Sequence, residues 1–245
     1  MSRGFDMRTG IVVQARMSSA RLPGKVLKPL AGKPVLAWLL ERLIDVKLSE
    51  KKGPGSMIVV ATSRAPEDDA VEALARSLGV GCYRGSLNDV AARLADAAQD
   101  AGFDAFVRAN ADSPLLDAAL IEHAYGIYAK NECDLVTNVF PRSFPQGMSV
   151  ELIEVAAMQR VLRSTDDPQD REHVTRFAYA NPGRFRILNF SAPRPRPELQ
   201  LSIDTPEDFV RIEDCVLRLG PRAARAGWEE IANCLEESTN APTRS

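Results

Sequence analysis

Short apolar runs rich in β-branched residues alternate along this chain with longer segments of helical period. This alternation constrains the fold strongly, because it is typical of βαβ units whose strands form a mainly parallel sheet. The sequence predicts strands over residues 10–14, 57–62, 103–109, 133–138 and 199–203. It predicts helices over residues 34–46, 67–80, 88–102 and 118–130. The pattern therefore indicates an α/β fold.

The ends of these helices have recognisable residues. Pro34 suits the first turn of the first helix, and Gly79 suits the end of the second. Asn88 is the expected N-cap of the third helix and Gly102 its expected end.

The chain of 245 residues fits a single domain, residues 1–245, that carries one small insertion. Residues 138–198 are rich in Pro and Arg and interrupt the alternation of strands and helices. Within them, helices are expected around 152–163 and 170–180. We therefore expect this segment to form a lobe beside the sheet. The polar termini, residues 1–8 and 236–245, are expected to be disordered.

Composition excludes several classes of protein. The formal net charge of −2 argues against a broad basic surface for nucleic acid. The four cysteines form no C-x-x-C pair, so neither a zinc site nor a disulfide framework is indicated. The N-terminus lacks the apolar core of a signal peptide, and no apolar stretch approaches the roughly 20 residues of a membrane helix. We expect a cytoplasmic protein with no nucleic-acid or membrane partner.

The loop after the first predicted strand, QARMSSARLPGK at residues 14–25, concentrates positive charge. Residues 7–40 contain six Lys or Arg and no Asp or Glu. Arg16, Arg21 and Lys25 suit phosphate oxygens, while small residues let backbone N–H groups approach an anion. Ligands of open α/β sheets bind outside the carboxyl ends of the strands, where this loop lies. The loop matches neither familiar glycine-rich phosphate signature, so a solvated basic turn is the alternative. In an empty site we expect Arg16 and Lys25 to extend into solvent.

Two acids follow other predicted strands at the same edge of the sheet. Asp112 lies in ADSPLL and Asp204 in IDTPEDF. A helix cap is the ordinary role of such an Asp, but Thr205 and Asp208 can form a capping box without Asp204. Two carboxylates facing a cationic loop suit Mg²⁺ bound to a nucleotide. The sequence thus predicts a site for a metal-bound polyphosphate.

Several motifs, read in order, resemble the CMP-sugar synthetase (cytidylyltransferase) family, in particular its spore-coat polysaccharide cytidylyltransferase-like branch. They are spread over residues 11–210, so the resemblance extends along most of the chain: QARMSSARLPGKVLKPLAGKPVL, RGSLNDV, NADSPLLD, FPQGMSVELI, DREHVTRF and IDTPEDF. The resemblance implies a Rossmann-like nucleotidyltransferase fold and a Mg²⁺-dependent reaction that joins CTP and a sugar and releases pyrophosphate. It also implies a homodimer in which the inserted lobe contributes to the partner's site.

The resemblance also implies roles for individual residues. The expected nucleotide-binding residues are Ala15, Arg16, Ser18, Arg21, Lys25, Arg84, Ser86, Asn88 and Asn110. Asp112 and Asp204 would bind magnesium and, with Arg16 and Lys25, form the catalytic group. The expected sugar-binding residues are Gln146, Glu151, Arg171, Glu172 and His173. For His173, a structural role in a helix is the alternative.

Two positions depart from the pattern of this branch. Ser18 stands where Gly is usual, and Gln200 stands where Arg is usual. These changes bear on substrate identity more than on reaction class, and the sequence names neither the sugar nor a general base.

Two other functions fit the same fold. A metal-dependent glycosyltransferase would use a nucleotide-sugar donor and normally carries an Asp-x-Asp motif, which neither Asp112 nor Asp204 forms. A non-catalytic nucleotide-binding protein would keep the loop and lack turnover.

Overall fold

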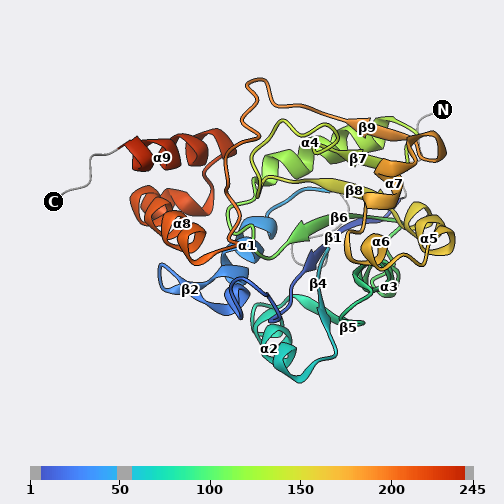
Figure 1. The fold of residues 1–245 in the computed structure, drawn as a ribbon, viewed down its shortest axis with the longest axis horizontal. Helices are drawn as coiled ribbons and strands as arrows, with labels where there is room; N and C mark the ends of the chain where they lie inside the picture. The colour runs from blue at the N-terminus through green and yellow to red at the C-terminus, as the bar shows by residue number, and fades with distance from the viewer. Residues whose placement is uncertain (1–6, 49–56, 241–245) are drawn as a thin grey trace.

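The computed structural model describes residues 7–48 and 57–240, and its centre is a seven-stranded sheet (Figure 1). The strand order across the sheet is β5-β4-β1-β6-β8-β7-β9. The strands are β1 (Thr9–Gln14), β4 (Ile58–Ser63), β5 (Gly81–Gly85), β6 (Ala105–Asn110), β7 (Leu135–Thr137), β8 (Glu151–Glu154) and β9 (Ile187–Asn189). Strand β8 is antiparallel to β6 and β7, and the other pairings of this sheet are parallel. The predicted mainly parallel α/β fold is confirmed.

Helices cover both faces of the sheet. Along β1, Ile11 and Val13 face one hydrophobic core and Val12 faces the other, as the two-residue period of a strand requires. The first core takes side chains from α1 (Val35–Leu43), α2 (Asp69–Ser77), α4 (Ala118–Lys130), α8 (Pro206–Leu219) and α9 (Trp228–Asn240). The second takes them from α3 (Val90–Asp100), α5 (Val155–Ser164) and α7 (Arg176–Ala180). With both faces covered, the ends of the strands are left as the place for a binding site.

Four of the five predicted strands are present as β1, β4, β6 and β7. The strand predicted at 199–203 is wrong, because this segment makes only an isolated bridge between Gln146 and Gln200. Its backbone is nevertheless held by two hydrogen bonds to Gln146. Gln146 N–H donates to Leu199 O, and Leu201 N–H donates to Gln146 O. The sequence did not predict β5, β8, β9 or the short hairpin of β2 (Pro29–Leu30) and β3 (Lys33–Pro34).

The helix ends partly follow the predictions. Gly79 and Gly102 have φ of +71° and +69°, the left-handed conformation that a glycine readily adopts at the end of a helix. The N-cap of α3 is Asp89, whose side chain accepts from Ala92 N–H, so the prediction of Asn88 is wrong. Pro34 is the N-cap of α1 and lies before its first turn.

The segment 138–198 is partly continuous with the sheet, since β8 and β9 belong to it. Residues 151–154 form β8, so the helix expected around 152–163 begins later, at Val155 of α5. The helix expected at 170–180 is two short helices, α6 (Pro168–Glu172) and α7. Figure 1 shows α5, α6 and α7 at one end of the sheet, remote from α8 and α9.

The expected disorder at the C-terminus is wrong for residues 236–240, because α9 continues to Asn240. Residues 7–8 are described as well, and Arg8 N–H donates to Asp104 Oδ2 over 2.7 Å. Residues 1–6 and 241–245 lie outside the described residues.

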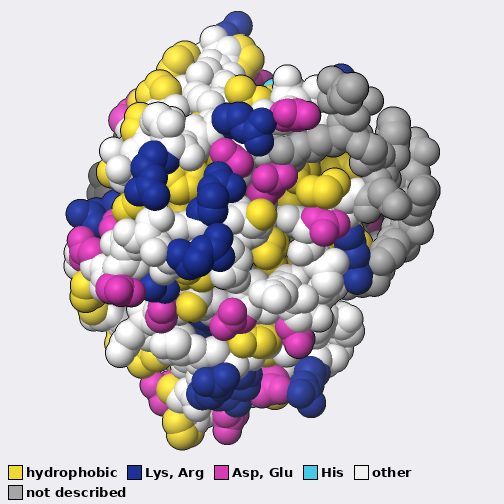
Figure 2. Space-filling model, turned by 90° about the vertical axis from the view of Figure 1, so that its right-hand side faces the viewer, with side chains coloured by type: hydrophobic (Ala, Val, Ile, Leu, Met, Phe, Trp, Pro, Cys, Tyr) yellow, Lys and Arg dark blue, Asp and Glu magenta, His cyan; other side chains and the backbone are white. Residues whose placement is uncertain are grey.

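Within the described part of the chain, no helix combines the length and apolar character needed to cross a membrane. On the face drawn in Figure 2, Lys and Arg side chains lie among Asp and Glu side chains.

Candidate active site

A cavity of about 270 Å³ opens where β1 and β6 end. The last residues of these strands, Gln14 and Asn110, are paired across the sheet. The cavity is lined by Gln14, Arg16, Ser18, Ser19, Ala20, Arg21, Lys25, Val26, Asn110, Ala111, Asp112 and Asp204. The structure thus brings together the basic loop and both predicted acids from three distant segments.

Lys25 lies at the centre of this cluster and is 8% exposed. Its Nζ donates to Asp112 Oδ2 at 2.8 Å, to Asp204 Oδ1 at 3.1 Å and to the carbonyl oxygen of Ile203 at 2.6 Å. A buried ammonium group needs such oxygen partners to offset its lost hydration. The expectation that Lys25 extends into solvent is therefore wrong.

Asp204 is free of capping duties, as the sequence predicted. Thr205 and Asp208 form the capping box of α8. The carboxylate of Asp204 instead pairs with Arg21 at 3.0 Å, while Gln200 Nε2 donates to its other oxygen at 3.2 Å. The unusual Gln200 thus contacts one of the two acids directly.

Asp112, two residues after the end of β6, is hydrogen-bonded to the segment of residues 199–203. Its carbonyl oxygen accepts from Ile203 N–H at 2.8 Å. Its side chain accepts from Ser113 Oγ at 3.3 Å and from Lys25. The backbone bond between Asp112 and Ile203 explains why two acids 92 residues apart in sequence, 112 and 204, face the same lysine.

Arg16 connects the loop to the second half of the chain. Its guanidinium pairs with Glu172 Oε1 of α6 at 2.8 Å, and both side chains are about one third exposed. The neighbouring Arg171 is turned elsewhere, since it donates to Asp89, Asp166 and the carbonyl oxygen of Leu162. The side chain of His173 is exposed at the break between α6 and α7. Glu172 alone among these three residues contacts a residue that lines the cavity.

Four predicted nucleotide-binding residues do not line this cavity. Ala15 is buried, and its N–H donates to Ala61 O, which continues the pairing of β1 with β4.

The guanidinium of Arg84 binds Asp69, Glu72 and two backbone carbonyl oxygens. Its hydrogen bond to Asp69 is the main cause that raises the pKa of Arg84. Ser86 Oγ accepts from Asp89 N–H at the start of α3, and Asn88 lies within the turn between these two residues. These contacts give Arg84 and Ser86 structural roles at the outer strands.

Glu151 is buried at 5% exposure, and its carboxylate is fully engaged. It accepts from Arg108 at 2.9 Å, from Thr175 Oγ1 at 2.7 Å and from the hydroxyl of Tyr179 at 2.6 Å. Burial and the nearby carboxylate raise the pKa of Tyr179. Glu151 therefore joins the sheet to α7 and does not project freely toward a ligand. Gln146, the other predicted residue of this motif, is exposed and pairs through its backbone with residues 199–201.

The sequence reasoning missed Gln14 and Arg108. Arg108 donates to Gln14 Oε1 at 3.2 and 3.3 Å and so connects a cavity-lining residue to Glu151. Both residues could have been recognised, because each is a polar residue that directly follows an apolar run within its strand, IVV before Gln14 and AFV before Arg108.

Comparison with known proteins gives the following similarities. Residues 10–235 match the family model described as Cytidylyltransferase. An uncharacterized protein of Methanocaldococcus jannaschii is 36% identical over 200 residues, which are 81% of this chain and 79% of that protein. The spore coat polysaccharide biosynthesis protein SpsF of Bacillus subtilis is 28% identical over 235 residues, 95% of either chain. The structure of a cytidylyltransferase from Leptospira borgpetersenii superposes with a TM-score of 0.88 at 28% identity, covering 98% of this chain and 100% of that one.

Proposed function

Because this chain belongs to the cytidylyltransferase family, we propose that it transfers CMP from CTP to a sugar hydroxyl. The products are an activated CMP-sugar and pyrophosphate. The observation that carries this proposal is the cavity lined by three cations of one loop and two carboxylates from other segments, in which two of the cations pair with the carboxylates. The named role of SpsF in spore coat polysaccharide biosynthesis supports surface polysaccharide as the destination of the product. The reaction belongs in the cytoplasm, where CTP is made.

The reaction is an in-line displacement at phosphorus. The sugar hydroxyl oxygen attacks the α-phosphorus of CTP, the bond from that phosphorus to the bridging oxygen breaks, and pyrophosphate leaves. The hydroxyl proton passes to solvent. Arg16, Arg21 and Lys25 hold the triphosphate and stabilise the negative charge that grows on the pyrophosphate. Residues Ser18 to Ala20 line the cavity, and their small side chains would let the triphosphate approach their backbone N–H groups.

The residues present fit a divalent metal ion. Both carboxylates already bond one cationic atom, Lys25 Nζ, so they can face a single ion. Mg²⁺ is commonly held by one or two carboxylates, with water and substrate phosphates as the remaining ligands. The described residues contain no group of three or more candidate metal ligands. Asp112 and Asp204 would hold Mg²⁺, which would draw charge from the reacting phosphate.

Pyrophosphate release tests the proposal. Purified protein with Mg²⁺ and CTP is given a panel of free sugars that includes 3-deoxy-octulosonic acid, nonulosonic acids and amino sugars. We expect pyrophosphate only when CTP and an accepted sugar are both present, and less with UTP. A glycosyltransferase would ignore CTP and consume a nucleotide-sugar, whereas a non-catalytic binding protein would bind CTP without turnover.

We further expect a two-fold homodimer built largely through residues 138–198. The segment interrupts the alternation of strands and helices. Glu172 within it pairs with Arg16 of the nucleotide loop, which is the basic loop at residues 14–25. A lobe so close to the site can contribute to a partner's site as well. Light scattering at micromolar concentration should give twice the chain mass of 26.8 kDa. A mass of one chain would remove this expectation and leave the proposed reaction standing.

A further inference from the structure

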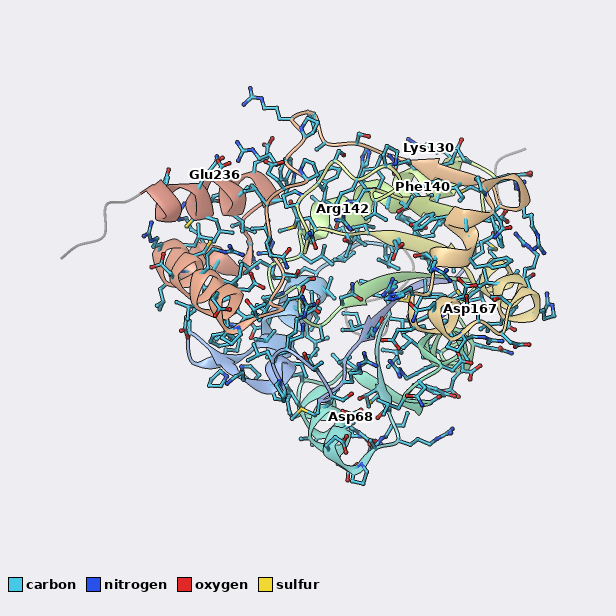
Figure 3. All side chains as sticks on the ribbon, in the orientation of Figure 1. Asp68, Lys130, Phe140, Arg142, Asp167 and Glu236 are labelled. Carbon is cyan, nitrogen blue, oxygen red and sulfur yellow. The ribbon has the colours of Figure 1, made fainter. Side chains whose placement is uncertain are left out.

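Asp68 is a carboxylate that the proposed reaction does not use, yet it is 1% exposed and tied to the nucleotide loop. It ends the short helix η2 (Pro66–Asp68), which follows β4, and it precedes α2 (Figure 3). Although it stands at the N-cap position of α2, its side chain makes no capping hydrogen bond there. The usual reason for an Asp at a helix start is therefore absent.

The carboxylate instead joins the loop after β1 to the last residue of the neighbouring strand β4. Asp68 Oδ1 accepts from Met17 N–H at 2.7 Å, in the loop after β1. Its Oδ2 accepts from Ser63 N–H at 3.0 Å and from the Ser63 hydroxyl, at the end of β4. Hydrogen bonds to an ionised acceptor are roughly twice as strong as neutral ones. The loop after β1 is thus held to the end of the neighbouring strand by a charged group.

Met17 is held from both sides. Its carbonyl oxygen accepts from Gly24 N–H at 2.9 Å, which closes the loop on itself. Gly24 has φ of +70°, a conformation that favours glycine. Met17 lies between Arg16 and Ser18, and Gly24 precedes Lys25. The backbone of one residue, Met17, therefore fixes both arms of the loop that carries the cations.

We propose that Asp68 is a positioning residue for the nucleotide loop. By fixing Met17 N–H it sets where Arg16 and Ser18 lie relative to Lys25 and the two acids. The inference rests on the proposed function, since it assigns the loop to the triphosphate of CTP. A shift of about 1 Å in a binding group can cost on the order of 100-fold in rate. A buried anion this close to a polyphosphate site is tolerated because N–H and O–H donors surround it.

The chemistry requires a carboxylate and not an amide. In Asp68→Asn the side chain has one oxygen acceptor in place of two. If that oxygen accepts from Met17 N–H, the amide NH₂ meets the N–H of Ser63, donor against donor. If it turns to Ser63, Met17 N–H loses its partner. Either way, Asp68→Asn loses its hydrogen bond to Met17 N–H or its hydrogen bond to Ser63 N–H.

Two substitutions separate positioning from general stability. Ser63→Ala removes the hydroxyl from the same buried cluster but keeps both backbone N–H bonds to Asp68. Glu67→Gln removes a carboxylate charge from the adjacent, exposed residue. We expect Ser63→Ala to lower the melting temperature and Glu67→Gln to leave it unchanged.

Calorimetry with Mg²⁺ and CTP is the main measurement. Asp68→Asn should raise the Kd for CTP roughly 10- to 100-fold, whereas Ser63→Ala and Glu67→Gln should stay within about twofold of the unmodified chain. If Asp68→Asn and Ser63→Ala lost the same amount of CTP affinity, the role of Asp68 would be merely structural and the proposal would be overturned. Failure of the unmodified chain to bind CTP would instead contradict the proposed function.

Amide hydrogen exchange on the unmodified protein provides a test that needs no variant. Met17 N–H should exchange much more slowly than the N–H groups of Ser18 and Ala20, for which no hydrogen bond is found in the described structure. Equal exchange rates for these amides would overturn the proposal even if Asp68→Asn failed to fold.

Discussion

Replacing Asp204 by Asn is expected to lower turnover on the order of 100- to 1,000-fold while the melting temperature changes little. The substitution removes a formal negative charge and a hard anionic ligand from a site proposed to hold a divalent cation. It keeps the size of the side chain. Pyrophosphate release at several Mg²⁺ concentrations, together with thermal melting of the metal-free protein, measures both effects.

The structure explains why stability should hold. The capping box of α8 uses Thr205 and Asp208 and does not need the side chain of Asp204. Removing the charge of Asp204 relieves its repulsion with Asp112, which would raise the melting temperature. It also weakens the ion pairs that Asp204 makes with Lys25 and Arg21, which would lower it. In Asp204→Asn, Lys25 keeps Asp112 and the carbonyl oxygen of Ile203. The stability gained from weaker repulsion and the stability lost with the ion pairs therefore largely offset each other.

Asp208→Asn is the matched control, because it removes the same charge four residues away. Asp208 Oδ2 accepts from the backbone N–H groups of Asp204 and Thr205, so its loss weakens the cap by about 1 kcal/mol. This variant should melt earlier and retain most of its turnover. If Asp204→Asn melted early and turned over at the normal rate, the acid would serve the helix and not the metal.

Replacing Lys25 by Met is expected to weaken CTP binding by about 1.5–3 kcal/mol, the loss typical of a charge-assisted hydrogen bond. The same change should strengthen binding of Mn²⁺ in the absence of nucleotide. In the empty site the ammonium group occupies the space between Asp112 and Asp204 and competes with a metal ion for their oxygens. In the unmodified protein, the phosphates of CTP would draw Lys25 away from Asp112 and Asp204, and CTP would therefore strengthen binding of the metal ion.

Electron paramagnetic resonance of Mn²⁺, with and without CTP, measures this coupling directly, and calorimetry gives the CTP affinity. Lys28→Met is the control, since Lys28 is exposed, lies three residues along the chain and packs over the ring of Phe209. It should change neither measurement. If Lys25→Met bound CTP normally and took up no more Mn²⁺, the basic loop would have no part in the site.

The fold class and the place of the candidate site could be predicted from the amino-acid sequence. Period-two and helical patterns are local, so β1, β4, β6, β7 and the helices between them could be predicted from short windows. Because parallel strands end at one edge, the loop after β1 and the acid after β6 had to meet there. Asp204 was found through its motif, since Thr205, Pro206 and Asp208 already account for the helix start.

Which charges are paired and which strands are neighbours depends on contacts between segments that are far apart in the sequence. Lys25 is buried because Asp112 and Asp204, 87 and 179 residues away in sequence, supply the oxygens that replace its water. Arg84 is taken by Asp69 and Glu72 of α2, and Glu151 by Arg108 and Tyr179. The antiparallel β8 could not be recognised from its own four residues, Glu151–Glu154, because a segment this short fits a strand or a helix. Its direction was settled by pairing with β6 and β7, and a window of sequence contains no information about partners that lie outside it.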